Sequence, residues 1–179
     1  MQLLNATNAE QLDKIHTLYE EAFPASEKKP FAFILQKRET ENFEILEIAD
    51  DEGAFLGLAI MMLYGQLVLL DYFAIASECR GKGVGSAALK ALQEKYAGKK
   101  FMLEIESTVG LSTGNEKQDR LRRKAFYLRN GMQPMDFQVD LFGVEMEVWV
   151  WGKSVTFEEY YSVLKSTVPA NLIHHVRLL

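Results

Sequence analysis

A loop rich in glycine separates a long apolar segment from a segment with helical periodicity. The loop reads Arg80-Gly-Lys-Gly-Val-Gly-Ser86, follows the apolar run Leu67 to Ile75 and precedes a helical pattern that starts near Ala87. Alternating glycines let the backbone approach a ligand closely, and a helix N-terminus offers unpaired N–H groups and the positive end of its dipole. Together with the Arg80 and Lys82 cations, this pattern predicts a loop that binds a phosphate or pyrophosphate group.

Hydrophobic periodicity predicts the helices and strands around this loop. The expected helices cover residues 8–23, 31–38, 87–97 and 121–130, with a last helix that begins at Thr156. The expected strands cover residues 43–49, 54–64, 67–75, 101–105, 138–142 and 144–151. The first three strands form an antiparallel meander, the third starts a βαβ unit with the strand 101–105, and the last two form a closing hairpin. The sequence therefore predicts an α/β fold of the α+β type with a mixed sheet.

Two helix starts carry capping boxes. At the first helix, Thr7-Asn8 supplies the cap and Glu10 the returning side chain; at the last helix, Thr156 and Glu159 take these places. Pro24 ends the first helix. Residues 168–179 are left without an assigned structure.

Composition limits the class of protein. With 179 residues, 48% hydrophobic and 25% charged, the chain has the size and composition of one globular domain. A net charge of −5 argues against binding to nucleic acid. One cysteine, Cys79, and three histidines give no zinc-ligand spacing, so we expect no metal. Without a signal-peptide pattern or an unbroken apolar run of about 20 residues, we expect a cytoplasmic protein that does not contact membranes.

The glycine loop also fits a dinucleotide-binding fingerprint. Gly83-x-Gly85-x-x-Ala88 has the required spacing, and Glu104 lies about 20 residues further on, where an acid would bind the ribose. However, residues 76–79 separate the loop from its strand, antiparallel strands precede that strand, and no further βαβ units follow. An NAD(P)-dependent oxidoreductase therefore stays an alternative of another class.

Two motifs resemble one family. Arg80-x-x-Gly83-x-Gly85 after an apolar strand resembles the acetyl-CoA signature of the GNAT N-acetyltransferase superfamily, Gln/Arg-x-x-Gly-x-Gly/Ala. The segment Ala125-Phe-Tyr-Leu-Arg-Asn-Gly131-Met132 is similar to the tyrosine-bearing helix of that family. The order of elements agrees over residues 1–151, which we expect to form the GNAT domain, and residues 152–179 are expected to pack on it as a helix and tail.

This resemblance implies the GNAT acyl-CoA N-acyltransferase fold and acetyl transfer from acetyl-CoA to a primary amine of a small molecule or peptide. The chain looks like a bacterial branch without an assigned substrate, and the resemblance also allows a homodimer. A protein that binds CoA and regulates without turnover is the second hypothesis. By resemblance, backbone amides of Phe73, Ala74 and Ile75 line the acetyl and pantetheine arm. By the same resemblance, the pyrophosphate is bound by the loop residues Arg80, Gly81, Lys82, Gly83, Val84, Gly85 and Ser86.

Tyr127 is the candidate acid for the CoA thiolate. At helical spacing it shares a face with Arg120, Arg123 and Lys124, opposite an apolar stripe of Leu121, Ala125 and Leu128. The neighbouring cations are expected to lower the pKa of Tyr127 from about 10. The alternative is a tyrosine that packs or contacts the pantetheine arm.

Acidic residues supply candidates for the base and for amine binding. Glu104 and Glu106 lie on one face of a strand, where like-charge repulsion raises one pKa, and we favour Glu104 as base. The alternative is a salt bridge to Arg120 or Arg123. Asp71 and Tyr72 are second-choice residues of the amine channel. Glu20 and Glu21 flank a turn that covers the substrate groove in the family; the alternative is a solvated helix end.

Overall fold

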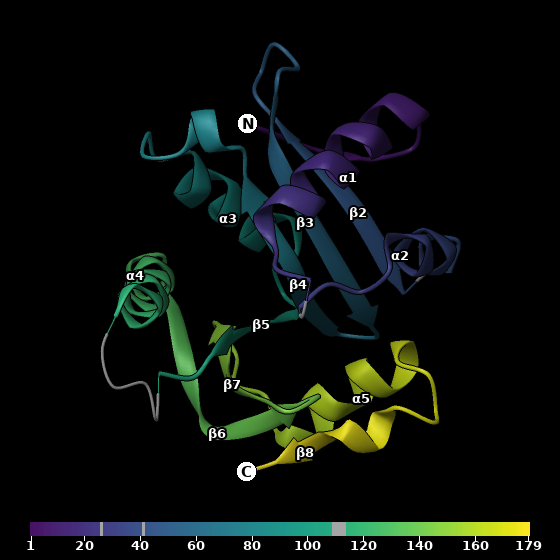
Figure 1. The fold of residues 1–179 in the computed structure, drawn as a ribbon, viewed down its shortest axis with the longest axis vertical. Coiled ribbons are helices and arrows are strands. Elements are labelled where there is room, and N and C mark those ends of the chain that lie inside the picture. Colours follow the sequence, from purple (N-terminus) through teal and green to yellow (C-terminus); the bar gives the residue numbers. More distant parts are fainter. Residues whose placement is uncertain (26, 41, 109–113) are drawn as a thin grey trace. The chain divides into compact units, whose positions relative to one another are not determined.

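The computed structural model describes residues 1–25, 27–40, 42–108 and 114–179, and these form two compact units (Figure 1). The first unit comprises residues 1–63 and 70–97, and the second comprises residues 64–69 and 98–179. Each unit contains strands and helices, which confirms the α/β class.

The first unit is built on the three strands of the predicted meander and on one further strand. In sheet order these are β1 Gln2–Asn5, β2 Phe43–Ala49, β3 Phe55–Tyr64 and β4 Leu67–Ile75. β2 pairs antiparallel with both β1 and β3, with Gln2 opposite Ala49 and Phe43 opposite Met62. β2 and β4 have the predicted bounds, whereas β1 was not predicted, because four residues are too short for a periodic signal.

The helices of the first unit are α1 Ala9–Ala22, α2 Phe31–Arg38 and α3 Val84–Lys95, with a 3-10 turn, η1, at Ser77–Cys79. Asn8 caps α1, and Gln11 closes the capping box, not Glu10 as predicted. α3 begins three residues before the predicted start, because Gly83 takes the N-cap position. The glycine loop is therefore shorter than its sequence suggested.

The second unit holds four strands in the order β5 Lys100–Glu106, β7 Val144–Trp151, β6 Met132–Leu141 and β8 Val176–Leu178, all antiparallel to their neighbours. The closing hairpin is thus confirmed. β6 starts six residues earlier than predicted, since a register shift between Pro134 and Gln138 breaks its alternation. The unassigned tail contains a 3-10 turn, η2 Ile173–His175, and β8.

The remaining helices of the second unit are α4 Asn115–Arg129, which contacts β5 and β6, and α5 Phe157–Thr167. Lys124 of α4 contacts Glu147 of β7, and Tyr160 of α5 contacts Glu104 of β5. The capping box of Thr156 and Glu159 is present as predicted. None of the helices in the described ranges is long and apolar enough to cross a membrane.

Candidate functional site

The glycine loop connects η1 to α3 and turns through two left-handed residues. Gly81 has φ +76° and Gly83 has φ +80°, a region that L side chains rarely adopt. A Cβ atom at either position would have no heavy atom within 4 Å. Both glycines therefore border open space, as a loop that receives a ligand requires.

The N-terminus of α3 carries no side-chain cap. Gly83 is the N-cap and offers no side chain, so the first-turn N–H groups of Val84, Gly85 and Ser86 lack intrahelical acceptors. The helix dipole adds partial positive charge at the same place. This arrangement suits an anion such as a pyrophosphate.

Two cations flank these amides. The Nε of Arg80 donates to the carbonyl of Ile75 at 2.8 Å, and the Nζ of Lys82 donates to the carbonyl of Glu78 at 3.2 Å. Both residues are exposed, and within the described residues neither forms a salt bridge with a carboxylate. Their charges thus remain available to a bound anion.

β4 leads into the loop, and its neighbour in the sheet, β3, approaches it closely at Gly57. Phe73 is half-buried, whereas Ala74 and Ile75 are buried. A Cβ at Gly57 of β3 would lie 2.3 Å from the carbonyl oxygen of Ala74, so only glycine permits this approach. Sequence reasoning missed Gly57. The role of the three β4 residues along the acetyl and pantetheine arm stays a prediction.

Asp71 and Tyr72 meet a lysine that the sequence did not single out. The Nζ of Lys29 lies 2.6 and 2.8 Å from the two carboxylate oxygens of Asp71 and 5.0 Å from the centroid of the Tyr72 ring. The Asp71 side chain is only 5% exposed. The structure therefore brings both predicted residues to one ammonium group.

The acidic end of α1 faces solvent. Glu20 and Glu21 are exposed, Glu20 forms an ion pair with Lys28, and a carboxylate oxygen of Glu20 lies 3.7 Å from Nε2 of His16. The hydrogen bond from Lys28 lowers the pKa of Glu20. These surroundings are those of a solvated helix end, and amine attraction by Glu20 and Glu21 stays a prediction.

In the second unit, Tyr127 is the buried residue of α4. Burial raises its pKa to about 12, and the opposing effect of Arg123 is smaller, so the predicted lowering is wrong. The predicted apolar stripe is wrong as well, because Leu121 and Leu128 are 48% and 60% exposed while Tyr127 is 8% exposed. The packed face instead buries the stems of Arg120 and Lys124, whose charged ends reach strand carboxylates.

The two candidate bases on β5 have different partners. Arg120 Nη2 lies 2.8 Å from Glu106 Oε1, and Arg123 Nη1 lies 3.1 Å from Oε2 of the same carboxylate. This confirms the salt-bridge alternative for Glu106. Glu104 instead accepts a hydrogen bond from the Tyr160 hydroxyl of α5, a partner that sequence reasoning missed.

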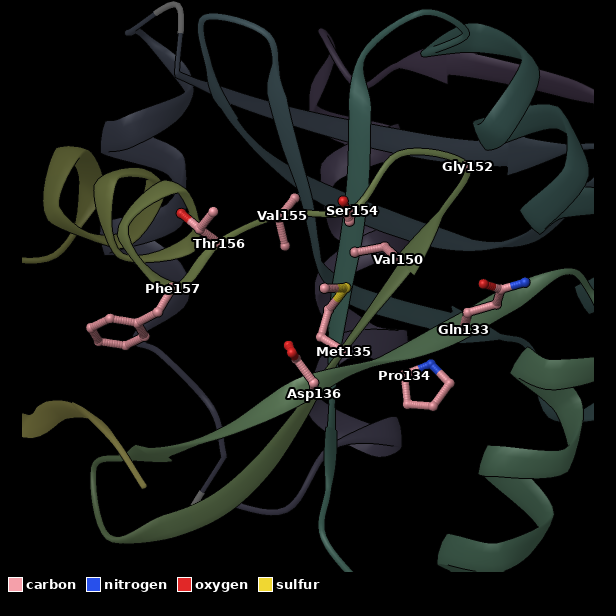
Figure 2. Close-up of a pocket in the computed structure, with 10 residues that line it drawn as sticks. All are labelled: Gln133, Pro134, Met135, Asp136, Val150, Gly152, Ser154, Val155, Thr156 and Phe157. Atoms are coloured by element: carbon pink, nitrogen blue, oxygen red, sulfur yellow. The ribbon is translucent and has the colours of Figure 1, made fainter.

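A surface pocket of about 620 Å³ lies where β6, the end of β7 and the start of α5 meet (Figure 2). Asp136 is its single charged lining residue, and none of the predicted site residues lines it. Across the part of the chain that the structure describes, no three His, Cys, Asp or Glu side chains gather as metal ligands would.

The chain is similar to known acetyltransferases in sequence and in fold. The model of the acetyltransferase (GNAT) family matches residues 12–131. A putative GNAT-family acetyltransferase from Bacteroides thetaiotaomicron superposes with a TM-score of 0.75 at 20% identity, covering 96% of this chain and 98% of that one. No curated protein matches significantly.

Two further solved structures share the fold. Spermidine N-acetyltransferase from Vibrio cholerae, in complex with CoA and spermine, has a TM-score of 0.64 at 13% identity and covers 89% of this chain and 96% of its own. An aminoglycoside 6'-N-acetyltransferase complexed with coenzyme A has a TM-score of 0.65 at 14% identity, with coverage of 87% and 100%. The chain therefore belongs to the GNAT acetyltransferase family of acetyl-CoA-dependent acyltransferases, and not to the dinucleotide-dependent oxidoreductases that the same glycine spacing allowed.

Proposed function

We propose that the protein transfers the acetyl group of acetyl-CoA directly to a primary amine. The observation that carries this proposal is the open glycine loop at the uncapped N-terminus of α3. Its amides and its two cations suit the pyrophosphate of CoA, so the residues from Arg80 to Ser86 are assigned to that group. No metal is needed for this binding.

Direct transfer requires a held thioester carbonyl, a deprotonated amine and a proton for the thiolate. The amine nitrogen bonds to the carbonyl carbon, the C–S bond breaks, and the sulfur takes a proton. Backbone donors along Phe73, Ala74 and Ile75 are assigned to the carbonyl, where one donor contributes about 3 kcal/mol to the transition state.

Tyr127 is our candidate acid. With a pKa of about 12, its hydroxyl keeps its proton throughout the neutral range and is able to donate it to a thiolate. The raised pKa also makes the hydroxyl a weaker acid, so the proposed acid role rests on the similarity of this helix to the tyrosine-bearing helix of the family and not on the pKa.

Glu104 is our candidate base, in preference to Glu106. Guanidinium donors occupy both oxygens of Glu106, which leaves it poorly placed to receive a proton from an amine. Glu104 accepts a hydrogen bond from the Tyr160 hydroxyl and is half-buried, and we assign it to serve directly or through a water. Asp71 and Tyr72 are assigned to the substrate ammonium.

Three structural relatives act on amines according to their names. These are the spermidine and aminoglycoside enzymes and the ribosomal-protein-S18-alanine N-acetyltransferase from Escherichia coli, which matches with a TM-score of 0.60 at 13% identity and covers 87% of this chain and 99% of its own. Their acceptors differ in size and class, so these relatives support an amine as acceptor without indicating which amine it is.

The cysteine content bears on where the protein acts. A single cysteine suits a reducing compartment, and we place the protein in the cytoplasm.

Calorimetric titration with CoA and with NADH, followed by an assay of thiol release, tests the proposal. We expect CoA to bind, NADH not to bind, and thiol release to depend on an amine from a panel of alkylamines, spermidine, aminoglycosides and peptide N-termini. Mass spectrometry should find one added acetyl group on that amine. CoA binding without release for any amine would support the regulator instead.

A further inference from the structure

The side chain of Lys29 lies in surroundings that recognise alkylammonium groups. Its Nζ lies 2.6 and 2.8 Å from the two Asp71 oxygens and 5.0 Å from the centroid of the Tyr72 ring. A carboxylate combined with an aromatic ring is a general solution for binding an organic cation. Lys29 is thus bound as a ligand amine would be.

Aromatic side chains support this site. The ring of Tyr72 packs edge-on against Tyr19, with centroids 4.8 Å apart, and against Phe23, with centroids 4.9 Å apart. Tyr19 is fully buried, and Tyr72 and the Asp71 carboxylate are each 5% exposed. Because water is largely excluded from Asp71, its attraction for an ammonium is stronger than that of a surface pair.

The backbone of Lys29 is anchored without its side chain. Its N–H donates to the hydroxyl of Tyr72 at 3.0 Å, and its carbonyl accepts from the hydroxyl of Tyr19 at 2.9 Å. The Tyr72 hydroxyl in turn donates to the carbonyl of Glu27 at 2.8 Å. The Lys29 side chain can therefore leave Asp71 while the segment stays in place.

The preceding lysine provides a contrast. Lys28 pairs with Glu20, an exposed residue at the end of α1, and contacts no aromatic ring in the described part of the chain. The two lysines carry the same charge on adjacent residues, yet only Lys29 reaches a buried carboxylate. If this segment only attracted acidic side chains in general, both lysines would be expected to pair with exposed carboxylates. The pairing of Lys29 with a buried carboxylate therefore needs a separate explanation.

We propose that Asp71 and Tyr72 form a binding site for a primary ammonium on an unbranched aliphatic chain, and that Lys29 occupies it until such an amine displaces its side chain. The claim that the displacing amine is the acceptor substrate rests on the proposed acetyl transfer, whereas the claim that the site binds an amine does not. Since a tethered group competes at an effective concentration of the order of millimolar, Lys29 raises the KM for an acceptor amine.

Substitution Lys29→Ala with n-propylamine as probe tests the site. Alanine removes Cγ, Cδ, Cε and Nζ, and protonated n-propylamine supplies the same atoms. We expect millimolar n-propylamine at neutral pH to raise the Tm of Lys29→Ala and to give a calorimetric binding signal. Wild type and Lys28→Ala should respond only at amine concentrations about tenfold higher.

Three controls separate this binding from general effects. 1-Propanol, which lacks the charge, should not stabilise Lys29→Ala. Lys29→Met, which keeps the stem in the site, and the double variant Lys29→Ala with Asp71→Asn should not respond to n-propylamine. An equal response in Lys28→Ala, or no response in Lys29→Ala, overturns the proposal.

Kinetics then link the site to the reaction. With n-butylamine or spermidine as acceptor, Lys29→Ala should lower the amine KM about tenfold with little change in kcat, while Lys28→Ala changes neither. Amine binding without thiol release in any variant would leave the ammonium site standing and refute the acetyl transfer. Thiol release with an unchanged KM in Lys29→Ala would refute displacement of Lys29 by the acceptor and leave the acetyl transfer standing.

Discussion

The hydroxyl of Tyr160 on α5 donates a hydrogen bond to the carboxylate of Glu104 on β5. Tyr160 is fully buried and lies beyond residues 12–131, the part of the chain that matches the family model. A second link, from Lys100 Nζ to Glu159 at 2.5 Å, joins the same two elements. The C-terminal helix is therefore bonded to the residue that we assign as the base.

Substitution Tyr160→Phe should destabilise the second unit and slow the reaction. It keeps the buried ring but leaves the Glu104 carboxylate without this donor, and a hydrogen bond to a charged group contributes about 1.5 to 3 kcal/mol. Urea denaturation should show a loss of that size in the free energy of unfolding. Tyr161→Phe, a change on the next residue of α5, should cost less than about 0.5 kcal/mol. Equal losses in the two variants would contradict this assignment.

Sequence reasoning placed Glu104 and Glu106 on one strand but could identify the hydrogen-bonding partners of only one of the two carboxylates. The arginines that bind Glu106 were named as the alternative to a base role, because they lie on a helix with a clear cationic face. Tyr160 was not, because its approach to Glu104 depends on how α5 packs, 56 residues further along the chain. Local patterns identify an element, whereas tertiary packing decides which side chains it brings to a carboxylate.

Substitutions Glu104→Gln and Glu106→Gln should have different effects. Loss of a base lowers kcat by a factor of about 10² to 10⁴, so we expect a fall in this range for Glu104→Gln, with the affinity for CoA unchanged. Glu106→Gln should keep kcat within a few-fold and instead lower the free energy of unfolding, because Arg120 and Arg123 lose a partly buried partner. Steady-state kinetics and urea denaturation of both variants check this. The reverse pattern would identify Glu106 as the base.

The orientation of α4 is the clearest failure of sequence reasoning. Periodicity selected Leu121, Ala125 and Leu128 as the buried stripe, but all three are exposed. The opposite face packs because Arg120 and Lys124 bury their stems and pair with Glu106 and Glu147. A hydropathy pattern counts such residues as polar throughout, and so it assigns the helix the wrong inner face.

Substitution Tyr127→Phe should change how stability depends on pH. Burial raises the pKa of Tyr127 to about 12 from about 10 in the unfolded chain, so the unfolded state loses this proton first as the pH rises. The stabilising contribution is complete below pH 10 and is lost between about pH 10 and 12. At pH 11 the loss amounts to about 1 kcal/mol, and Tyr127→Phe should not show it. Urea denaturation at pH 9 and 11 measures the difference.

The same variant tests the acid role at neutral pH. If Tyr127 protonates the thiolate, Tyr127→Phe lowers the maximal rate while the dissociation constant of acetyl-CoA changes little. Leu128→Ala, on the exposed face of the same helix, serves as the matched control and should leave both quantities unchanged. An unchanged rate in Tyr127→Phe would remove the residue from proton transfer.

The position of the glycine loop between a strand and a helix was predicted correctly, because its signal is local, whereas its role in binding stays a prediction. Glycines at 81 and 83 adopt left-handed conformations, and the helix that follows starts at once. The pair of Lys29 and Asp71 could not be read in the same way, since 42 residues separate them and only the packing of α1 against β4 joins them.

Substitution Gly83→Val should abolish measurable binding of CoA. Valine at φ +80° is strained, and its side chain enters the open space that we assign to the pyrophosphate. Gly53→Val is the matched control, because Gly53 has φ +87° and equally open surroundings in the turn between β2 and β3. Both variants should lose about 1 to 2 kcal/mol of folding free energy to backbone strain. Calorimetric titration should find the affinity for CoA lowered at least a hundredfold in Gly83→Val and unchanged in Gly53→Val. Equal weakening of CoA binding in both variants would mean that backbone strain, and not the loss of the loop's open space, lowers the affinity.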